Sequence, residues 1–326
     1  MGVSVNGSWT SGSVHGTMTF LSSCDAPRVG LISRRSIPGR CAFNVSAVPK
    51  DLSEAARVGV RLALDIGSRN PLRRAALLVA PLLVGSGLRR GPLRVRLRLA
   101  GGERDFVVPD LAGFLVLWEV FSEGAYADGL PAGARTIVDL GANSGASVLF
   151  LAGRYPGARI VAVEAGPAVF GVLEANVGGL PGVRCVHGAV TSTGEPVTFH
   201  DAGESWGGWT HAPGSADDPA PAGPAQVVAP VDLDALIAEA GPVDLLKIDV
   251  EGAEFDVLPA CAGLDAVGTI VGEIHAAAGD PRTVALLEVV GRGRRVTITS
   301  PPGRYTTFVA GPSAGDDGGQ RPRVGE

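Results

Sequence analysis

The sequence predicts an α/β fold, a mostly parallel sheet with helices on both faces. From about residue 134, short apolar runs rich in β-branched residues alternate with segments of helical periodicity. The runs are almost continuously apolar, which is typical of strands that are buried on both faces. Strand and helix patterns that alternate along a chain indicate a parallel sheet. At 326 residues and 45% apolar content, the chain is large enough to bury a sizeable core.

Seven strands are expected in this part of the chain. Five of them are the runs RTIVDL (135–140), ARIVAVE (158–164), VRCVHGAV (183–190), VDLLKIDV (243–250) and GTIVGEIH (268–275). One more helix is expected after Pro281. The segments RRVTITS and YTTFVA then flank a Pro-Pro-Gly turn, which predicts a closing antiparallel hairpin.

The chain divides into four predicted regions. Residues 1–50 lack sustained periodicity and are expected to be a disordered N-terminal segment, and residues 311–326 have the composition of a disordered tail. Residues 51–130 are expected to form an N-terminal α+β extension, with two helices, a hairpin around two adjacent glycines and a third helix. Residues 131–310 are expected to form the main domain.

One insertion interrupts the main domain. Residues 201–225 are rich in Gly, Pro and Ala and carry Trp206 and Trp209. Loops of this length are either functional or disordered, and two indoles are unusual in a solvated linker. A lid over a substrate and a disordered insertion therefore both stay open.

The composition of the chain limits the kinds of partner that it is expected to bind. A net charge of −5 gives no electrostatic footprint for nucleic acid. The longest charge-free apolar run, residues 75–88, is interrupted by Pro81 and is shorter than the roughly 20 residues that cross a bilayer. We therefore expect this run to form a buried helix, and we expect no membrane partner. Four scattered cysteines without metal spacing fit a reducing compartment, and we expect a cytoplasmic protein.

The turn after the first main strand predicts a ligand site. This strand contains Asp139, and the chain then passes through Gly141, Asn143 and Gly145 into a helix. Such turns lie at the carboxyl edge of the sheet, where open α/β sheets bind ligands. The dinucleotide-binding fingerprint requires glycine at its third position, where this chain has Asn143, so a nicotinamide dinucleotide is disfavoured. The turn is not followed by the GK[ST] sequence of a phosphate-binding loop, so that type of site is excluded.

The next strand ends at Glu164, where a carboxylate can accept hydrogen bonds from both hydroxyls of a ribose. NAD and S-adenosylmethionine share this feature. A ligand without a pyrophosphate tolerates Asn143, and a sulfonium cation gains from a nearby Asp139, so the turn favours S-adenosylmethionine. We also place Ala189, at the end of the third run, among the cofactor-binding residues.

A second group of polar residues is expected at the same edge. Asp249 and Glu251 follow the fourth run, and His275 follows the fifth. Lys247, one of only two lysines in the chain, lies inside the fourth run, which suggests that this position requires an ammonium group.

Four segments together resemble the FkbM family of S-adenosylmethionine-dependent methyltransferases: DLGANSG, the strand ending in Glu164, LLKIDVEGAEFDVL and EIH. The resemblance spans roughly residues 104–310. It implies a class I (Rossmann-like) methyltransferase fold with a seven-stranded sheet whose last strand is antiparallel. It also implies O-methylation of a hydroxyl on a natural product or a sugar, as in secondary metabolism. Residues 165–167, the insertion at 201–225 and the first 50 residues depart from the family pattern.

Transfer of a methyl group to a hydroxyl oxygen requires loss of the hydroxyl proton, to a general base or with the help of a metal. The candidate catalytic residues are His275, Asp249 and Glu251. A histidine with an ordinary pKa suits the role of base, while Asp249 would orient it, bind the acceptor or cofactor, or hold a divalent metal. Metal dependence stays open at this point.

Two other functions remain as alternatives. An NAD-dependent oxidoreductase would have to fit its dinucleotide over Asn143. A non-catalytic protein would bind S-adenosylmethionine without turnover. The expected partner is a small-molecule hydroxyl acceptor, and the sequence does not reveal an oligomeric state.

Overall fold

The computed structural model describes residues 16–18, 31–33, 52–201, 208–211, 225–300 and 303–312. Most of residues 1–50, the tail after residue 312, and the segments 202–207 and 212–224 lie outside this range. The predictions of disorder at both ends, and the choice between lid and disorder for the insertion, fall largely on those residues. Within the first segment, the short strands β1 (Gly16–Met18) and β2 (Leu31–Ser33) pair antiparallel.

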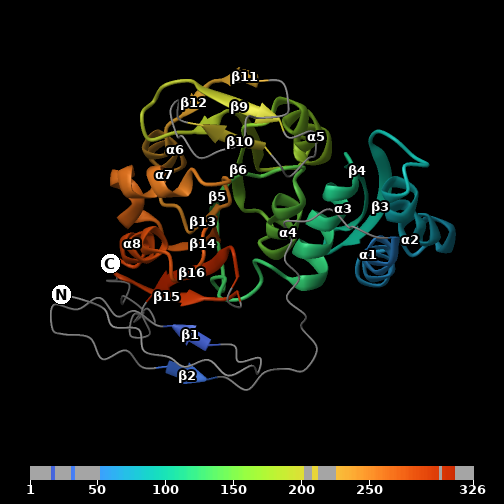
Figure 1. Ribbon diagram of the computed structural model, residues 1–326, viewed down its shortest axis with the longest axis horizontal. Helices are drawn as coiled ribbons and strands as arrows, with labels where there is room; N and C mark the ends of the chain where they lie inside the picture. The colour runs from blue at the N-terminus through green and yellow to red at the C-terminus, as the bar shows by residue number, and fades with distance from the viewer. Residues whose placement is uncertain are drawn as a thin grey trace, which may run out of the picture.

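The predicted seven-stranded, mostly parallel sheet is confirmed. The strand order is β15-β16-β14-β13-β5-β6-β7, and the five strands from β14 to β7 are parallel (Figure 1). The last strand in the chain, β16, is antiparallel to both of its neighbours and is inserted between β14 and β15. The strands span β5 (Thr136–Leu140), β6 (Arg159–Glu164), β7 (Val183–His187), β13 (Leu245–Ile248), β14 (Thr269–Ile274), β15 (Arg294–Ile298) and β16 (Thr306–Pro312).

Helices cover both faces of this sheet. Successive strand residues point to opposite faces, so Ile137 joins one apolar core and Val138 the other. One face packs against α4 (Ala146–Arg154) and α5 (Pro167–Val177). The other packs against α6 (Leu233–Ala240), α7 (Glu254–Ala260) and α8 (Pro281–Val290) (Figure 1). The 3₁₀ turn η2 (Ala262–Ala266) contacts α6.

The predicted N-terminal extension shares a core with the sheet. Phe106 and Phe114, both fully buried, belong to the same apolar cluster as Ile137. Asn176 on α5 makes a second link, because its side chain exchanges hydrogen bonds with the backbone of Val107 and donates to Ser144 O at 2.8 Å. The elements are α1 (Leu52–Asp65), α2 (Pro71–Gly85), β3 (Leu93–Leu99), β4 (Gly102–Val108), α3 (Leu111–Trp118) and the π-helical turn η1 (Glu119–Glu123).

The expectation that residues 75–88 form a buried helix is only half right. They form most of α2, but this helix packs against α1 on one side, and Leu78, Val79 and Leu83 remain 38–39% exposed on the other. Among the described residues, every helix is too short or too polar to cross a membrane.

Small β elements fill the stretch between β7 and α6. The pair β8 (Ala189–Val190) and β12 (Pro230–Val231) is parallel. The strand β9 (Val197–Asp201) pairs antiparallel with β10 (Gly208–His211) and β11 (Ala225–Val228), as Figure 1 shows above the main sheet. The described residues of the insertion, 201, 208–211 and 225, therefore belong to three strands that the sequence analysis did not predict.

Candidate active site

The turn after β5 requires its glycines for steric reasons. Gly141 has φ 76°, and a Cβ atom on it would lie 1.7 Å from Asp249 O. Gly145 has φ 94°, and a Cβ atom on it would lie 2.9 Å from Val177 Cγ1. Asn143, with φ 48°, is one of the few side chains that tolerate the left-handed region. The turn therefore packs closely against the end of β13 and against α5.

A buried ion pair lies beneath this turn and explains the lysine at position 247. Lys247 Nζ donates to Gly141 O at 2.7 Å and lies 3.2 Å from Asp139 Oδ1. Asp139 is fully buried, and its other oxygen accepts from Ser147 Oγ at 2.6 Å. Although burial acts to lower it, the charges of Asp139 and Asp249 raise the pKa of Lys247. Asp139 is thus placed to support the turn, and its contact with a sulfonium stays a prediction.

Glu164 joins the turns that follow β5 and β6. Its Oε2 accepts from Asn143 N at 2.9 Å, and its Oε1 accepts from Gly166 N at 2.8 Å. Burial raises the pKa of Glu164, against the effect of these two hydrogen bonds. Each carboxylate oxygen keeps a lone pair for a further donor. Ala189 is buried one strand away, where Gly188 N donates to Glu164 O at 3.0 Å.

The three predicted catalytic residues come together at the carboxyl edge. His275 Nε2 lies 3.1 Å from Glu251 Oε2 and 3.8 Å from Asp249 Oδ1. On the other side of the ring, Nδ1 lies 3.2 Å from Oε1 of the fully buried Glu254. Glu251 has φ 51°, an unfavourable conformation for a glutamate that is more common at functional sites than elsewhere.

The electrostatics correct one expectation about His275. Although burial acts to lower it, hydrogen bonds to Glu251 and Glu254 and the charge of Asp249 raise the pKa of His275 to about 12. These acidic neighbours therefore favour the protonated imidazolium over the neutral ring. The expectation of an ordinary pKa for His275 is therefore wrong, whereas its catalytic role stays a prediction.

The site contains residues that sequence reasoning missed. Tyr126 OH, from the end of the extension, donates to Asp249 Oδ2 at 3.0 Å, and Lys247 Nζ lies 5.4 Å from the centre of its ring. Burial and the charge of Asp249 raise the pKa of Glu119 to about 7 and that of Glu273 to about 9. Glu273 stands in the EIH segment and could have been proposed from sequence. Tyr126 and Glu119 carry no such signal.

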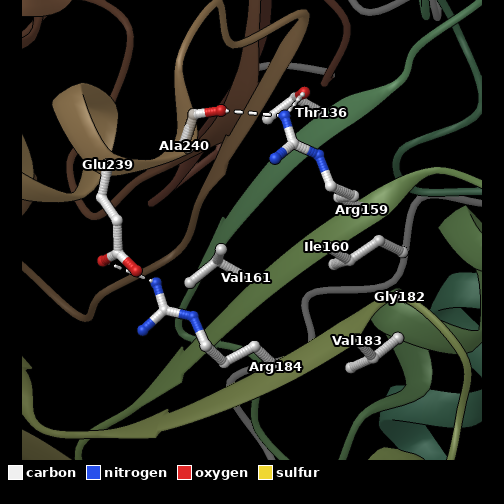
Figure 2. A pocket seen from close by; sticks show the side chains of 9 residues that line it. All are labelled: Thr136, Arg159, Ile160, Val161, Gly182, Val183, Arg184, Glu239 and Ala240. Carbon is white, nitrogen blue, oxygen red and sulfur yellow. Dashed lines mark hydrogen bonds and ion pairs between the residues drawn. The ribbon is translucent and has the colours of Figure 1, made fainter.

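A cavity of about 330 Å³ lies at the opposite edge of the sheet (Figure 2). It is lined by the first residues of β5, β6 and β7 and by the end of α6. Its charged groups already have partners in the protein: Arg159 Nη2 donates to Ala240 O at 3.0 Å, and Arg184 Nη2 forms an ion pair with Glu239 Oε2 at 3.0 Å. This cavity is separate from the residues at the carboxyl edge.

The fold and the position of the site define a class of protein. A seven-stranded sheet in this order, with an inserted antiparallel strand and polar residues at the carboxyl edge of its centre, is the class I methyltransferase fold. Residues 139–291 match the model of the methyltransferase FkbM domain, and every predicted site residue lies within them. This match confirms the resemblance to the FkbM family that the sequence motifs indicated.

Solved structures resemble the chain in fold at low identity. They include precorrin-6y C5,15-methyltransferase from Geobacter metallireducens, with 13% identity and a TM-score of 0.36 over 63% of this chain and 88% of that one. An O-methyltransferase family protein from Burkholderia thailandensis has 15% identity and a TM-score of 0.37 over 62% and 58%. Aeropyrum pernix fibrillarin with natively bound S-adenosyl-L-methionine has 14% identity and a TM-score of 0.38 over 68% and 95%. No curated protein sequence matches the chain.

Proposed function

We propose that this methyltransferase uses S-adenosylmethionine to methylate a hydroxyl oxygen of a small molecule, of the natural-product or sugar class. One observation carries the proposal. The turn from Gly141 to Gly145, together with Glu164, lies at the same sheet edge as the cluster of Asp249, Glu251 and His275. A turn suited to the methyl donor and a polar cluster suited to a hydroxyl acceptor are therefore neighbours.

The residues at the first turn fit the proposed cofactor. Glu164 is fixed by two backbone donors and retains lone pairs for the two hydroxyls of a ribose. Hydroxyl donors would also stabilise a carboxylate that burial otherwise penalises. Gly141 and Gly145 let the turn pack against the end of β13 and against α5, which fixes the backbone that the cofactor would contact. When bound, S-adenosylmethionine supplies a methyl group that is activated by its positively charged sulfur.

The residues of the polar cluster would position the acceptor. Holding two reacting atoms in line near contact contributes roughly 7–11 kcal/mol to catalysis. Asp249 and Glu251 can accept hydrogen bonds, and the contact of Glu251 with His275 holds its carboxylate in place, so together they can fix a hydroxyl in one orientation. Because its acidic neighbours raise its pKa, His275 is poorly suited to take up the hydroxyl proton, and a different group is expected to assist its removal.

Binding and transfer test the proposal separately. Calorimetry is expected to show one S-adenosylmethionine site per chain, and a labelled methyl group is expected to appear on oxygen when a panel of hydroxylated natural products and sugars is supplied. Binding of NADH in place of S-adenosylmethionine would instead support an oxidoreductase. Tight cofactor binding with no transfer to any acceptor in the panel would favour a non-catalytic binding protein.

Substitution of Glu164 tests the cofactor site directly. Glu164→Ala is expected to weaken S-adenosylmethionine binding by about 1–3 kcal/mol, because donors on the ribose and on the backbone lose their acceptor. Calorimetry measures the change. Glu174→Ala, at an exposed position on the neighbouring α5, is the matched control and is expected to leave the affinity unchanged. Equal affinity of the two variants would remove Glu164 from the cofactor site.

A further inference from the structure

Four carboxylates surround a single histidine in the polar cluster. His275 ring nitrogens lie within 3.1–3.8 Å of carboxylate oxygens of Asp249, Glu251, Glu254 and Glu273. Lys247 lies 3.9 Å from Asp249, but its ammonium is already paired with the buried Asp139. The cluster therefore brings four carboxyl groups to one imidazole, and the nearest lysine already has a partner of its own.

Three side chains in this cluster have the geometry of a ligand set. One ligand atom each from Asp249, Glu251 and His275 lie within 4.8 Å of one another. They come from three positions that the fold fixes: the end of β13, the turn after it, and the end of β14. Glu251 is 42% exposed, so an ion can reach the group from solvent.

The environment of the histidine ring also supports a metal site. Nδ1 is oriented by the buried carboxylate of Glu254, whose Oε1 also accepts from the backbone N of His275. Metal-bound histidines generally donate their second ring N–H to such a carboxylate, which fixes the ring and directs the other nitrogen to the metal. The nitrogen on the far side, Nε2, is the one that points at Glu251 and Asp249.

We propose that Asp249, Glu251 and His275 bind a divalent cation, with Glu273 beside it. A set of two carboxylates and one imidazole suits a cation that accepts oxygen ligands readily, such as Mn²⁺ or Mg²⁺. Three protein ligands leave further positions for water or for the acceptor hydroxyl. The existence of this cation site does not depend on the proposed function. The catalytic role of the cation rests on the proposed function.

In that role Asp249, Glu251 and His275 would hold a cation that could bind the acceptor oxygen and lower the pKa of its hydroxyl. The hydroxyl proton passes to solvent water, an oxygen lone pair forms the new C–O bond, and the electron pair of the C–S bond stays with the sulfur. His275 would bind the cation through Nε2 and would lose the proton on that nitrogen, so the cation, and not the imidazole as a base, would activate the acceptor.

Mn²⁺ binding tests the inference without any methyl transfer. The full chain, freed of metal by a chelator, is titrated with Mn²⁺ and free ion is measured by electron paramagnetic resonance. One Mn²⁺ per chain is expected, with at least about tenfold weaker binding in Glu251→Gln, because loss even of a residue that only orients a ligand costs about 10–100-fold. Glu239→Gln, a carboxylate at the opposite edge, is the control and is expected to bind as the wild type does.

Two outcomes overturn the inference: no Mn²⁺ binding by the folded wild type, or equal Mn²⁺ affinity in wild type and Glu251→Gln. If Glu251→Gln does not fold, as judged by circular dichroism, Asp249→Asn replaces it with the same expected loss. Full methyl transfer by chelator-treated protein would remove the catalytic role of the cation and leave the proposed function intact. Failure to bind S-adenosylmethionine would contradict the proposed function, whereas a measured Mn²⁺ site would remain valid.

Discussion

Gly141→Ala is expected to lower the free energy of unfolding by about 2–5 kcal/mol. The left-handed conformation at φ 76° costs an alanine about 1–2 kcal/mol. A Cβ atom placed 1.7 Å from Asp249 O forces the turn and the end of β13 apart, and overpacking of this kind costs about 1–3 kcal/mol more. Urea denaturation measures the total.

Gly157→Ala is the matched control for this substitution. Gly157 also has a left-handed φ, 85°, but a Cβ atom there would meet nothing within 4 Å. Its expected loss is therefore only about 1–2 kcal/mol. If both variants lose the same amount, the close approach to Asp249 is not the reason for glycine at position 141.

Lys247→Met is expected to cost about 3–5 kcal/mol of stability. The substitution removes the only cation paired with the fully buried Asp139 among the described residues and leaves an uncompensated charge in the core. Chemical denaturation again provides the measurement. In the double variant Lys247→Met, Asp139→Asn the buried charge is absent, so part of the lost stability is expected to return.

An exposed ion pair provides the control for Lys247. Arg184 and Glu239 lie 3.0 Å apart with side chains 46% and 62% exposed. Arg184→Met is expected to cost less than about 1 kcal/mol, since exposed pairs contribute little. A loss for Lys247→Met as small as that for Arg184→Met would show that water solvates Asp139 when the lysine is removed.

Local patterns were sufficient to predict the sheet and the position of the site. Each main strand is a short apolar run, and parallel strands place their following residues at one edge. Asp249 and His275 could therefore be placed near each other from sequence alone. The glycines of the first turn were also recognised, although the sequence did not reveal that Gly141 packs against the carbonyl of Asp249.

Long-range contacts limited the prediction of the site. Tyr126 reaches Asp249 across 123 residues of sequence, and no periodicity encodes such a pair. The raised pKa of His275 could not be predicted from the local sequence either, because it results from several carboxylates that surround the ring in three dimensions. A motif can place a residue at an edge, but its charge state depends on all of its neighbours.

The order of the strands also affects how the chain folds. The central strands β5 and β13 are neighbours, yet Lys247 and Leu140, which meet there, are 107 residues apart. Closing so long a segment costs entropy before any contact is gained, whereas β5, β6 and β7 follow one another closely along the chain. The three strands that carry the proposed cofactor turn are therefore expected to assemble first during refolding, and pulsed hydrogen exchange would show protection in β5 before β13. His275 and its carboxylates come together only when β13 and β14 dock, so the polar cluster is expected to form after the proposed cofactor turn.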